Sequence, residues 1–303
     1  MRRYLPFMRL ARIWVGISVL TLVVAVVSLA TRGVNLGIDY RGGTQLELRF
    51  DQPRTVPEVR EAVARSVGSV PTVRQAELKG QATGAEFLVT TVSLTPEQRT
   101  QLRADLEKAL GKFEVVSESE VSPTIRRELI EKALLAVAIA SVLQLIYIAI
   151  RFEFKFGVAA VVALLHDAIV LLGFFSLLGM EVGPAFLAAV LTVIGYSIND
   201  TIVVFDRIRE NLHRPHKGEP LEALVDRSIN ETLVRSLNTA GTTLAAIAAI
   251  LFFGGETTRD FALALFVGIL SGTYSSIFVA SPLWFWWKRA EKRQPGTRAV
   301  LAR

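Results

Sequence analysis

Two aspartates lie inside apolar stretches where a charged side chain is costly. Asp167 lies in the run 156–180 beside His166, and Asp200 lies in the run 182–205 beside Asn199. In the middle of a bilayer an ionised side chain costs at least about 2.5–3.5 kcal/mol on insertion scales. Such side chains usually face the interior of a helix bundle and serve ion or proton pathways. We therefore expect proton binding and release at Asp200 and Asp167, the alternative being a structural hydrogen bond between helices.

A polar stripe follows in the segment 232–243. Its members recur at steps of three or four, which places them on one side of a helix: Thr232, Arg235, Thr239, Thr242 and Thr243. We expect the stripe to face the bundle interior or a wet cavity. Since arginine stays charged, a carboxylate that alternates between pairing with Arg235 and carrying a proton would be the titrating member. The alternative for Arg235 is an anchor at the membrane interface.

The elements that must position these residues are membrane helices. Apolar residues make up 51% of the 303-residue chain and charged residues 20%, and several uncharged runs of 18 or more residues exclude a purely soluble protein. A bilayer-spanning helix needs about 20 apolar residues. Six runs qualify: 13–31, 133–150, 156–180, 182–205, 236–253 and 261–287. A signal peptide is the alternative for the first run, but its length and the following Arg32 favour a retained helix.

The basic residues predict the orientation of these helices. With the N-terminus in the cytoplasm, the inside segments are 1–12, 151–155, 206–235 and 288–303, and they contain eighteen Lys and Arg residues. The short outside loops contain one, Arg259. This positive-inside bias predicts two cytoplasmic termini. The net charge of +6 therefore fits topology and anionic membrane lipid, and nucleic-acid binding is not needed to explain it.

The segment 32–132 is predicted to form an external domain. Strand patterns at 44–50, 73–78, 87–93 and 113–121 alternate with helical stretches at 57–67 and from Pro96 onward, and 79–84 is a hairpin loop. The order β-α-β-β-α-β is typical of a ferredoxin-like α+β fold. The domain is joined to the first membrane helix by the sequence GIDYRGGT, with Gly37, Asp39, Gly42 and Gly43. This segment is either a glycine-rich bend into a strand or a hinge between membrane and domain.

Several enzyme classes find no support in the sequence. The chain has no cysteine, which excludes disulfides, thiolate metal sites and cysteine nucleophiles. It also has no phosphate-binding loop, no HExxH motif and no GxSxG motif. We expect no enzymatic activity, no cofactor and no metal, so the transmembrane gradient is the available source of energy.

These residues resemble a known family. The segment 37–44 is similar to the signature after the first membrane helix of SecF, an accessory subunit of the bacterial Sec protein-export machinery. The segments 195–211 and 227–236 are similar to the SecF motifs in the fourth membrane helix and at the start of the fifth. The resemblance covers nearly the whole chain, and it implies one half of a permease of the RND superfamily, with six membrane helices and one external domain.

The resemblance also implies function and partners. It implies a complex with SecD that associates with the SecYEG channel and often with YajC. This complex would use the proton-motive force to pull a preprotein across the inner membrane after SecA has driven it in. The proton-relay aspartate and arginine of the family correspond to Asp200 and Arg235, and Asp167 belongs to the same polar interior and is expected to take part in the relay. We expect four supporting polar residues: Asn199, Thr239, Thr242 and Thr243. Sodium is the alternative coupling ion.

Three other functions compete with this interpretation. A structural scaffold for SecD and the channel would tolerate neutralisation of Asp200. An intramembrane aspartyl protease also has two aspartates on neighbouring helices, but Asp200 lies in a SIND sequence rather than Gly-x-Gly-Asp. A small-molecule exporter of the RND type is disfavoured, because one small external domain is too little to build a porter.

Overall fold

The computed structural model describes residues 4–75, 86–151 and 153–293 of the chain. The chain folds into two compact units, with boundaries at Asn35/Leu36 and Leu135/Ala136. Some predicted segments lie wholly or partly outside the described residues: the hairpin loop 79–84, the end of strand 73–78, residues 1–3 of the N-terminal segment, residue 152 of the segment 151–155, and 294–303 of the C-terminal tail.

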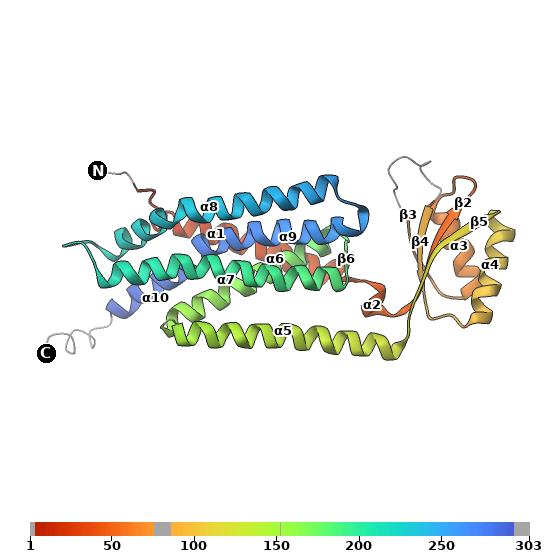
Figure 1. Ribbon diagram of the computed structural model, residues 1–303, viewed down its shortest axis with the longest axis horizontal. Helices are drawn as coiled ribbons and strands as arrows, with labels where there is room; N and C mark the ends of the chain where they lie inside the picture. Colours follow the sequence, from red (N-terminus) through yellow and green to blue (C-terminus); the bar gives the residue numbers. More distant parts are fainter. Residues whose placement is uncertain (1–3, 76–85, 152, 294–303) are drawn as a thin grey trace. The chain divides into compact units, whose positions relative to one another are not determined.

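The unit between Leu36 and Leu135 is a four-stranded sheet with helices packed on it (Figure 1). A short helix α2 (Ile38–Arg41) leads into β2 (Gly43–Phe50), and the chain continues through α3 (Val56–Val67), β3 (Thr72–Gln75), β4 (Glu86–Thr91), α4 (Pro96–Leu110) and β5 (Phe113–Val121). The strand order is β3-β4-β2-β5, and every neighbouring pair is antiparallel. This is the ferredoxin-like arrangement that the sequence predicts.

Capping residues fix the starts of two helices in this unit, and apolar residues on its strands and helices form its core. Thr55 with Glu58, and Thr95 with Gln98, form capping boxes that fix the first residues of α3 and α4. One face of the sheet and the two helices enclose a common apolar core, which contains Leu46, Leu48, Phe50, Val59, Val63, Phe87, Val89, Leu102 and Leu106. The unit thus has its own hydrophobic core, as an independent domain requires.

The other unit is a helical bundle. It contains α1 (Ala11–Arg32), most of α5 (Pro123–Arg151), α6 (Phe154–Leu178), α7 (Pro184–His213), α8 (Leu221–Phe253), α9 (Glu256–Ser275), a π-helical turn η1 (Ser276–Ala280) and α10 (Ser281–Arg293); the two-residue strands are β1 (Asn35–Leu36) and β6 (Glu181–Val182). Within the described residues, six helical segments are long and apolar enough to cross a membrane. This confirms the predicted number of membrane helices. The sixth is continuous through α9, η1 and α10.

Small residues bring the central helices of the bundle close together. α7, α8 and α9 run side by side in Figure 1. On α9, Gly268 and Gly272 are four residues apart and face Val193 and Ser197, which are four apart on α7. A Cβ atom added at Gly272 would lie 2.8 Å from the Cβ atom of Ser197. Such small-xxx-small contacts are the usual means of close helix packing in membranes.

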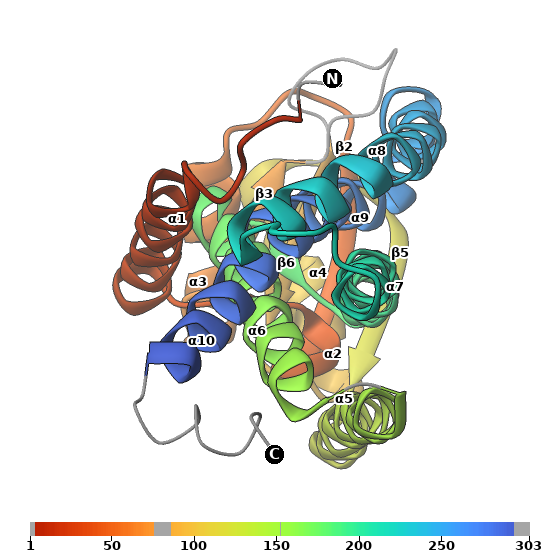
Figure 2. The same cartoon turned by 90° about the vertical axis from the view of Figure 1, so that its left-hand side faces the viewer.

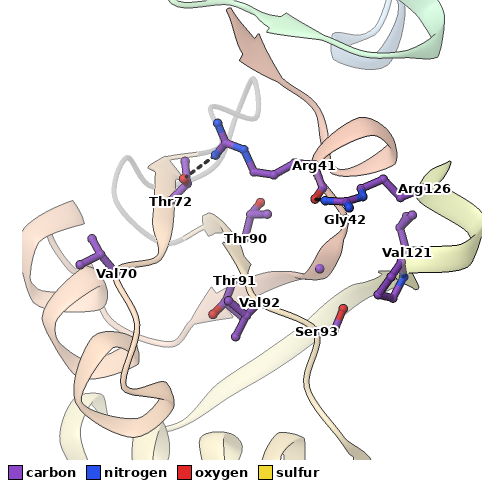
Figure 3. A pocket seen from close by; sticks show the side chains of 12 residues that line it. Arg41, Gly42, Val70, Thr72, Thr90, Thr91, Val92, Ser93, Val121 and Arg126 are labelled. Carbon is purple, nitrogen blue, oxygen red and sulfur yellow. Dashed lines mark hydrogen bonds between the residues drawn. The ribbon is translucent and has the colours of Figure 1, made fainter. Parts of the chain in front are cut away.

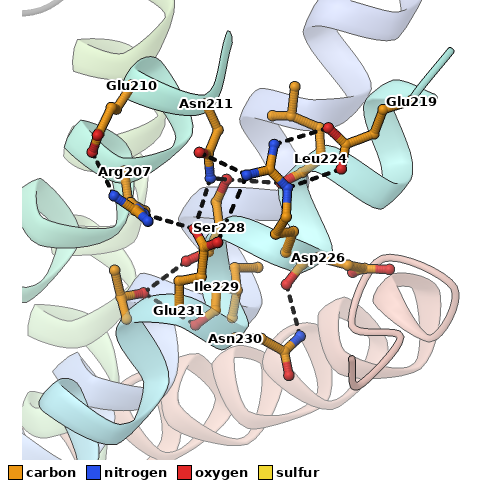
Figure 4. A network of polar contacts seen from close by, with 12 residues as sticks. Arg207, Glu210, Asn211, Glu219, Leu224, Asp226, Ser228, Ile229, Asn230 and Glu231 are labelled. Atoms are coloured by element: carbon orange, nitrogen blue, oxygen red, sulfur yellow. Dashed lines mark hydrogen bonds and ion pairs between the residues drawn. The ribbon is translucent and has the colours of Figure 1, made fainter. Parts of the chain in front are cut away.

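A dense network of polar side chains joins the ends of α7 and α8 (Figure 4). Arg227 is nearly buried and donates to both carboxylate oxygens of Glu219, at 2.9 and 2.8 Å. Arg227 also donates to the side-chain oxygen of Asn211 at 2.9 Å, and the Asn211 amide donates to Ser228. The hydrogen bond from Arg227 holds the pKa of the Glu219 carboxyl below its usual value. The network fixes the short connection between the two helices.

The close approach of α9 to α7 predicts the effect of a single methyl group. We expect Gly272→Ala to lower the free energy of unfolding by about 1–3 kcal/mol, because the helices must move apart or Ser197 must shift. Thermal unfolding of the purified protein in detergent measures this. Gly16→Ala on α1 is the matched control, since nothing lies within 4 Å of a Cβ at Gly16. Equal stability of the two variants would contradict the packing.

The Glu219–Arg227 pair predicts a dependence of stability on pH. The pKa of Glu219 is lowered in the folded protein, so its contribution is present above the unfolded value of about 4.3 and is lost as the pH falls through the lower folded value. Glu219→Gln should therefore lower the free energy of unfolding by about 1–3 kcal/mol at neutral pH, and the difference should shrink below about pH 4.

Denaturant unfolding over a pH series checks this expectation. Glu61→Gln is the control, because the Glu61 side chain is 67% exposed in its pair with Arg65, and an exposed pair contributes only about 0–1 kcal/mol. A difference between wild type and Glu219→Gln that stays constant from neutral to acid pH would refute the role of the ionised pair.

Candidate functional site

Asp167 lies buried on α6, where three serine hydroxyl groups surround its carboxylate. The residue is 1% exposed. Ser197 on α7 and Ser275 on α9 each donate to its Oδ2 atom at 2.7 Å, and Ser271 on α9 donates to Oδ1 at 2.7 Å. α6, α7 and α9 are neighbours in the bundle, as the end-on view in Figure 2 shows. Asp167 is thus the point at which three membrane helices are hydrogen-bonded together.

His166 completes the surroundings of Asp167. Its Nδ1 atom lies 3.1 Å from Asp167 Oδ1. Its ring lies nearly parallel to that of Tyr274, at 6.4 Å between centroids, and Tyr274 donates its hydroxyl to the backbone oxygen of Trp14. Within the described part of the chain, the buried His166 Nε2 atom has no hydrogen-bond partner. His166 therefore contacts the carboxylate directly, although it precedes Asp167 on the same helix.

Asp200 lies on α7 one turn after Ser197 and is 8% exposed. Two further hydroxyl groups hold its carboxylate. Ser236 on α8 donates to Oδ1 at 2.6 Å, and Ser276 at the start of η1 donates to Oδ2 at 2.5 Å. The adjacent residues Ser275 and Ser276 thus reach different carboxylates, because successive residues of a helix point in directions about 100° apart. One short segment of chain connects the two acidic sites.

This arrangement is suited to proton binding. A serine hydroxyl can donate to a carboxylate and can also accept from a protonated carboxyl group, so both protonation states have hydrogen-bond partners. A buried carboxylate without such partners would be strongly disfavoured. Within residues 4–75, 86–151 and 153–293, no cluster of three or more His, Asp or Glu side chains could hold a metal ion.

The predicted polar stripe on α8 takes a different position from the one expected. Arg235, Thr239 and Thr242 are exposed on the surface of this chain, as is Asn199 on α7. Thr243 is partly buried and donates its hydroxyl to the backbone oxygen of Thr239 at 2.8 Å. The side of α8 that packs against the bundle instead carries the small residues Ser236 and Ala240. Thr232, the first residue of the stripe, is buried, so only part of the stripe faces the interior within this chain, and Ser236 rather than Arg235 reaches Asp200.

Sequence reasoning missed the five serines that hold the two carboxylates: Ser197, Ser236, Ser271, Ser275 and Ser276. A signal was present, because Ser271 and Ser275 are four residues apart in an apolar helix and flank Gly272. Serine is common in membrane helices as a small packing residue, so its spacing alone did not distinguish a donor from a spacer.

The glycine motif has a local structural role in the ferredoxin-like unit. Gly42 and Gly43 have φ angles of 73° and 124°, which side chains rarely adopt. A Cβ atom on Gly43 would lie 2.1 Å from the backbone oxygen of Thr91 on β4. Gly37 precedes α2 and Asp39 lies in its first turn. Gly43 thus allows β2 to start close against β4, whereas Gly42 lies against Arg126 and the backbone oxygen of Val121.

A cavity of about 320 Å³ lies beside these glycines, within the same unit (Figure 3). Arg41 donates to the Thr72 hydroxyl at 3.3 Å across its mouth, and Arg126 donates to the backbone oxygen of Arg41 at 3.3 Å. These contacts tie Arg41, the residue before Gly42, to β3 and to the start of α5. The glycine segment is therefore held in place by polar contacts within its own domain.

Comparisons with known proteins identify the family of the chain. Residues 101–290 match the family model for the C-terminal region of the protein export membrane proteins SecD and SecF, and residues 27–53 match the SecD/SecF GG motif. The chain is 42% identical over 294 residues to a protein translocase subunit SecF of Desulfurispirillum indicum, covering 94% of this chain and 92% of that protein. A SecF of Acidaminococcus fermentans is 43% identical, with 93% and 97% covered.

Solved structures agree with this. A crystal structure of SecDF from Thermus thermophilus, described as a translocon-associated membrane protein, matches with a TM-score of 0.84 at 40% identity and covers 95% of this chain. A SecDF structure in a super-membrane-facing form matches with a TM-score of 0.68 at 38% identity and covers 98% of this chain. The chain spans 39% and 40% of these two SecDF chains. The chain belongs to the SecD/SecF family of protein translocase subunits.

Proposed function

We propose that this chain is the SecF-like subunit of a SecD–SecF complex, and that proton binding at Asp200 couples the proton-motive force to late stages of preprotein translocation through SecYEG. The observation that carries the proposal is the position of Asp200. Its carboxylate is buried between three membrane helices and is held by the neutral hydroxyls of Ser236 and Ser276. A proton can bind there without leaving a buried group unpaired.

The energy source follows from the chemistry that the chain carries. The sequence has no nucleotide-binding motif. Moving one elementary charge across a membrane potential releases about 2.3 kcal/mol per 100 mV, which is enough to shift a balance between two packed arrangements of helices. In this proposal, protonation of Asp200 changes the packing of α7 against α8 and η1, and the Gly42–Gly43 segment passes the motion to the external domain. The domain 32–132 then lies on the outer side of the inner membrane, with both termini in the cytoplasm.

The exposed polar side of α8 supports a second membrane subunit as partner. Arg235, Asn238, Thr239 and Thr242 are exposed on this chain, and Asn199 on α7 is exposed as well. Lipid cannot satisfy such groups, and an arginine facing hydrocarbon is strongly disfavoured. One relative is a longer chain, 40% of which aligns with this chain. It is named protein translocase subunit SecDF. SecD is therefore the partner that we propose to cover this surface.

In that complex Arg235 takes the role of a gate. Arg235 directly precedes Ser236, and the Ser236 hydroxyl reaches Asp200. Arg235 and Asp200 therefore lie at a similar depth in the proposed membrane region. The guanidinium group stays charged under all physiological conditions. It therefore stabilises the ionised form of Asp200 when it approaches and releases the carboxylate for protonation when it withdraws. The channel SecYEG, YajC, SecA and the moving preprotein complete the proposed set of partners.

Removal of the titrating group at Asp200 tests the proposed function. In membrane vesicles that contain the full Sec complex, we expect Asp200→Asn to abolish the stimulation of preprotein export by the proton-motive force. The amide is the same size as the carboxyl group but cannot exchange a proton. Asp206→Asn is the matched control, because Asp206 lies on the same helix with its side chain 48% exposed.

Copurification of SecD, measured in the same vesicles, separates a lost relay from a lost complex. Full stimulation in the Asp200→Asn vesicles, with the complex intact, would contradict the relay and favour a purely structural scaffold.

The partner surface makes a separate prediction. We expect Thr239→Trp, on the exposed side of α8, to reduce copurification of SecD about tenfold, because a bulky ring prevents close approach of the partner helix. Val23→Trp on α1 is the control, since Val23 is an apolar side chain 52% exposed. Undiminished copurification in Thr239→Trp would show that SecD does not cover this surface.

A further inference from the structure

Ser275 and Ser276 each lie within hydrogen-bond distance of two acceptors. The Ser275 hydroxyl lies 2.7 Å from Asp167 Oδ2 and 3.2 Å from the backbone oxygen of Gly272. The Ser276 hydroxyl lies 2.5 Å from Asp200 Oδ2 and 3.0 Å from the backbone oxygen of Thr273. A hydroxyl group has one proton, so it can donate to only one of the two acceptors at a time.

The other serines around the two carboxylates differ in this respect. In the described structure Ser197, Ser271 and Ser236 have a carboxylate oxygen as hydrogen-bond acceptor, and no second acceptor is seen for their hydroxyls. Both Ser275 and Ser276 are 0% exposed, so water cannot replace either of their bonds. The choice between carboxylate and backbone is therefore confined to two adjacent residues, at the point where α9 passes into the π-helical turn.

We propose that Ser275 and Ser276 are two-position hydroxyl switches that report the protonation of Asp167 and Asp200 to the backbone of α9. This inference rests on the proposed function for its biological meaning. When Asp200 is ionised, the Ser276 hydroxyl donates to it. When a proton from the aqueous phase binds Asp200 Oδ2, the new O–H donates to the Ser276 oxygen, and the Ser276 hydroxyl turns to donate to the Thr273 backbone oxygen. Ser275 does the same between Asp167 and Gly272.

Each step of this switch leaves every polar group paired. The carboxylate gains one proton and becomes a hydrogen-bond donor to the serine. The serine hydroxyl no longer donates to the carboxyl group, and its oxygen accepts from it instead. The Ser276 hydroxyl needs only to turn between its two acceptors, because both are already in reach. A dry, tightly packed site can therefore change its charge without a penalty for an unsatisfied group.

The switches share one segment of backbone, and this links the two carboxylates. Gly272 and Thr273 are consecutive, as are Ser275 and Ser276. The segment continues into η1, where the Ser281 hydroxyl donates to the backbone oxygen of Ser276 at 3.0 Å. A π-helical turn is a local irregularity in the hydrogen-bond ladder and is frequent at functional sites. An additional hydrogen bond to the Thr273 or Gly272 oxygen thus changes the backbone hydrogen bonding of the turn that carries both serines.

The ionisable groups around the switches are few in the described structure. His166 on α6 contacts Asp167, and Tyr274 on α9 stacks on His166. On α7, Tyr196 lies near enough to interact electrostatically with Asp200, and on α8 Arg235 is exposed on this chain. In the proposed switch, the serines determine what protonation of either carboxylate does to α9.

Solid-state NMR on the SecD complex in lipid bilayers tests the switch at its backbone acceptors. The measured quantities are the carbonyl ¹³C shifts of Thr273 and Gly272 as the pH is lowered. We expect the Thr273 signal to move with the protonation of Asp200, and the Gly272 signal with that of Asp167, because each carbonyl gains a hydrogen bond. A wild-type Thr273 signal that stays constant while Asp200 titrates, or while Asp200 fails to titrate at all, would overturn the proposal.

Variants assign each movement to one hydroxyl. In Asp200→Asn the Thr273 signal should stay at its acid position at every pH, because the amide donates to Ser276 as a carboxylic acid does. In Ser276→Ala it should not move, whereas in the control Ser236→Ala, which removes the other donor to Asp200, the movement should persist. A Thr273 signal that still moves in Ser276→Ala would refute the switch. Export that is unaffected by Asp200→Asn, together with a moving Thr273 signal, would refute only the proposed function.

Discussion

The structure of the bundle depends on the need to keep two carboxyl groups paired in an apolar interior. Asp167 and Asp200 together receive hydrogen bonds from five serine hydroxyls on three segments of chain. Each hydroxyl must come within 3 Å of its carboxylate, which requires unusually close helices. Gly272 meets this requirement by allowing α9 to lie against Ser197, and Gly268 does the same against Val193 one turn earlier. The small residues and the acidic residues of this bundle are thus parts of one arrangement.

The same need for hydrogen-bond partners applies to the polar residues on the exposed side of α8. Hydroxyl groups satisfy the acidic side of α7, but Arg235, Asn238 and Thr239 on α8 are exposed. In a lipid environment these groups need protein or water around them. In the proposed complex a partner subunit would cover this surface, and Arg235 would regulate the charge of Asp200. The hydroxyl pairing inside the chain and the polar surface outside it then have separate roles, one in accommodating the proton and one in controlling it.

Much of this organisation could be predicted from the sequence, because the strongest signals were local. Apolar runs gave the number of membrane helices, and strand alternation with capping residues such as Thr55 and Thr95 gave the order of the external domain. Asp167 and Asp200 stood out because a charge in an apolar run is rare. Which side of α8 faces the bundle interior could not be predicted. Both Arg235 and Ser236 lie in the same helix, and packing against α7 decides which of them faces Asp200.

The π-helical turn at Ser276–Ala280 was also beyond prediction, because no residue type specifies such a turn and it arises from the packing around it.

Infrared difference spectroscopy of the SecD complex in proteoliposomes tests the central claim most directly, namely that Asp200 exchanges a proton within the membrane. Acidification should produce a band from a protonated carboxyl group that is present in wild type and in Asp206→Asn but absent in Asp200→Asn. The same bands in wild type and Asp200→Asn would show that Asp200 keeps one protonation state, and would contradict proton coupling at this residue.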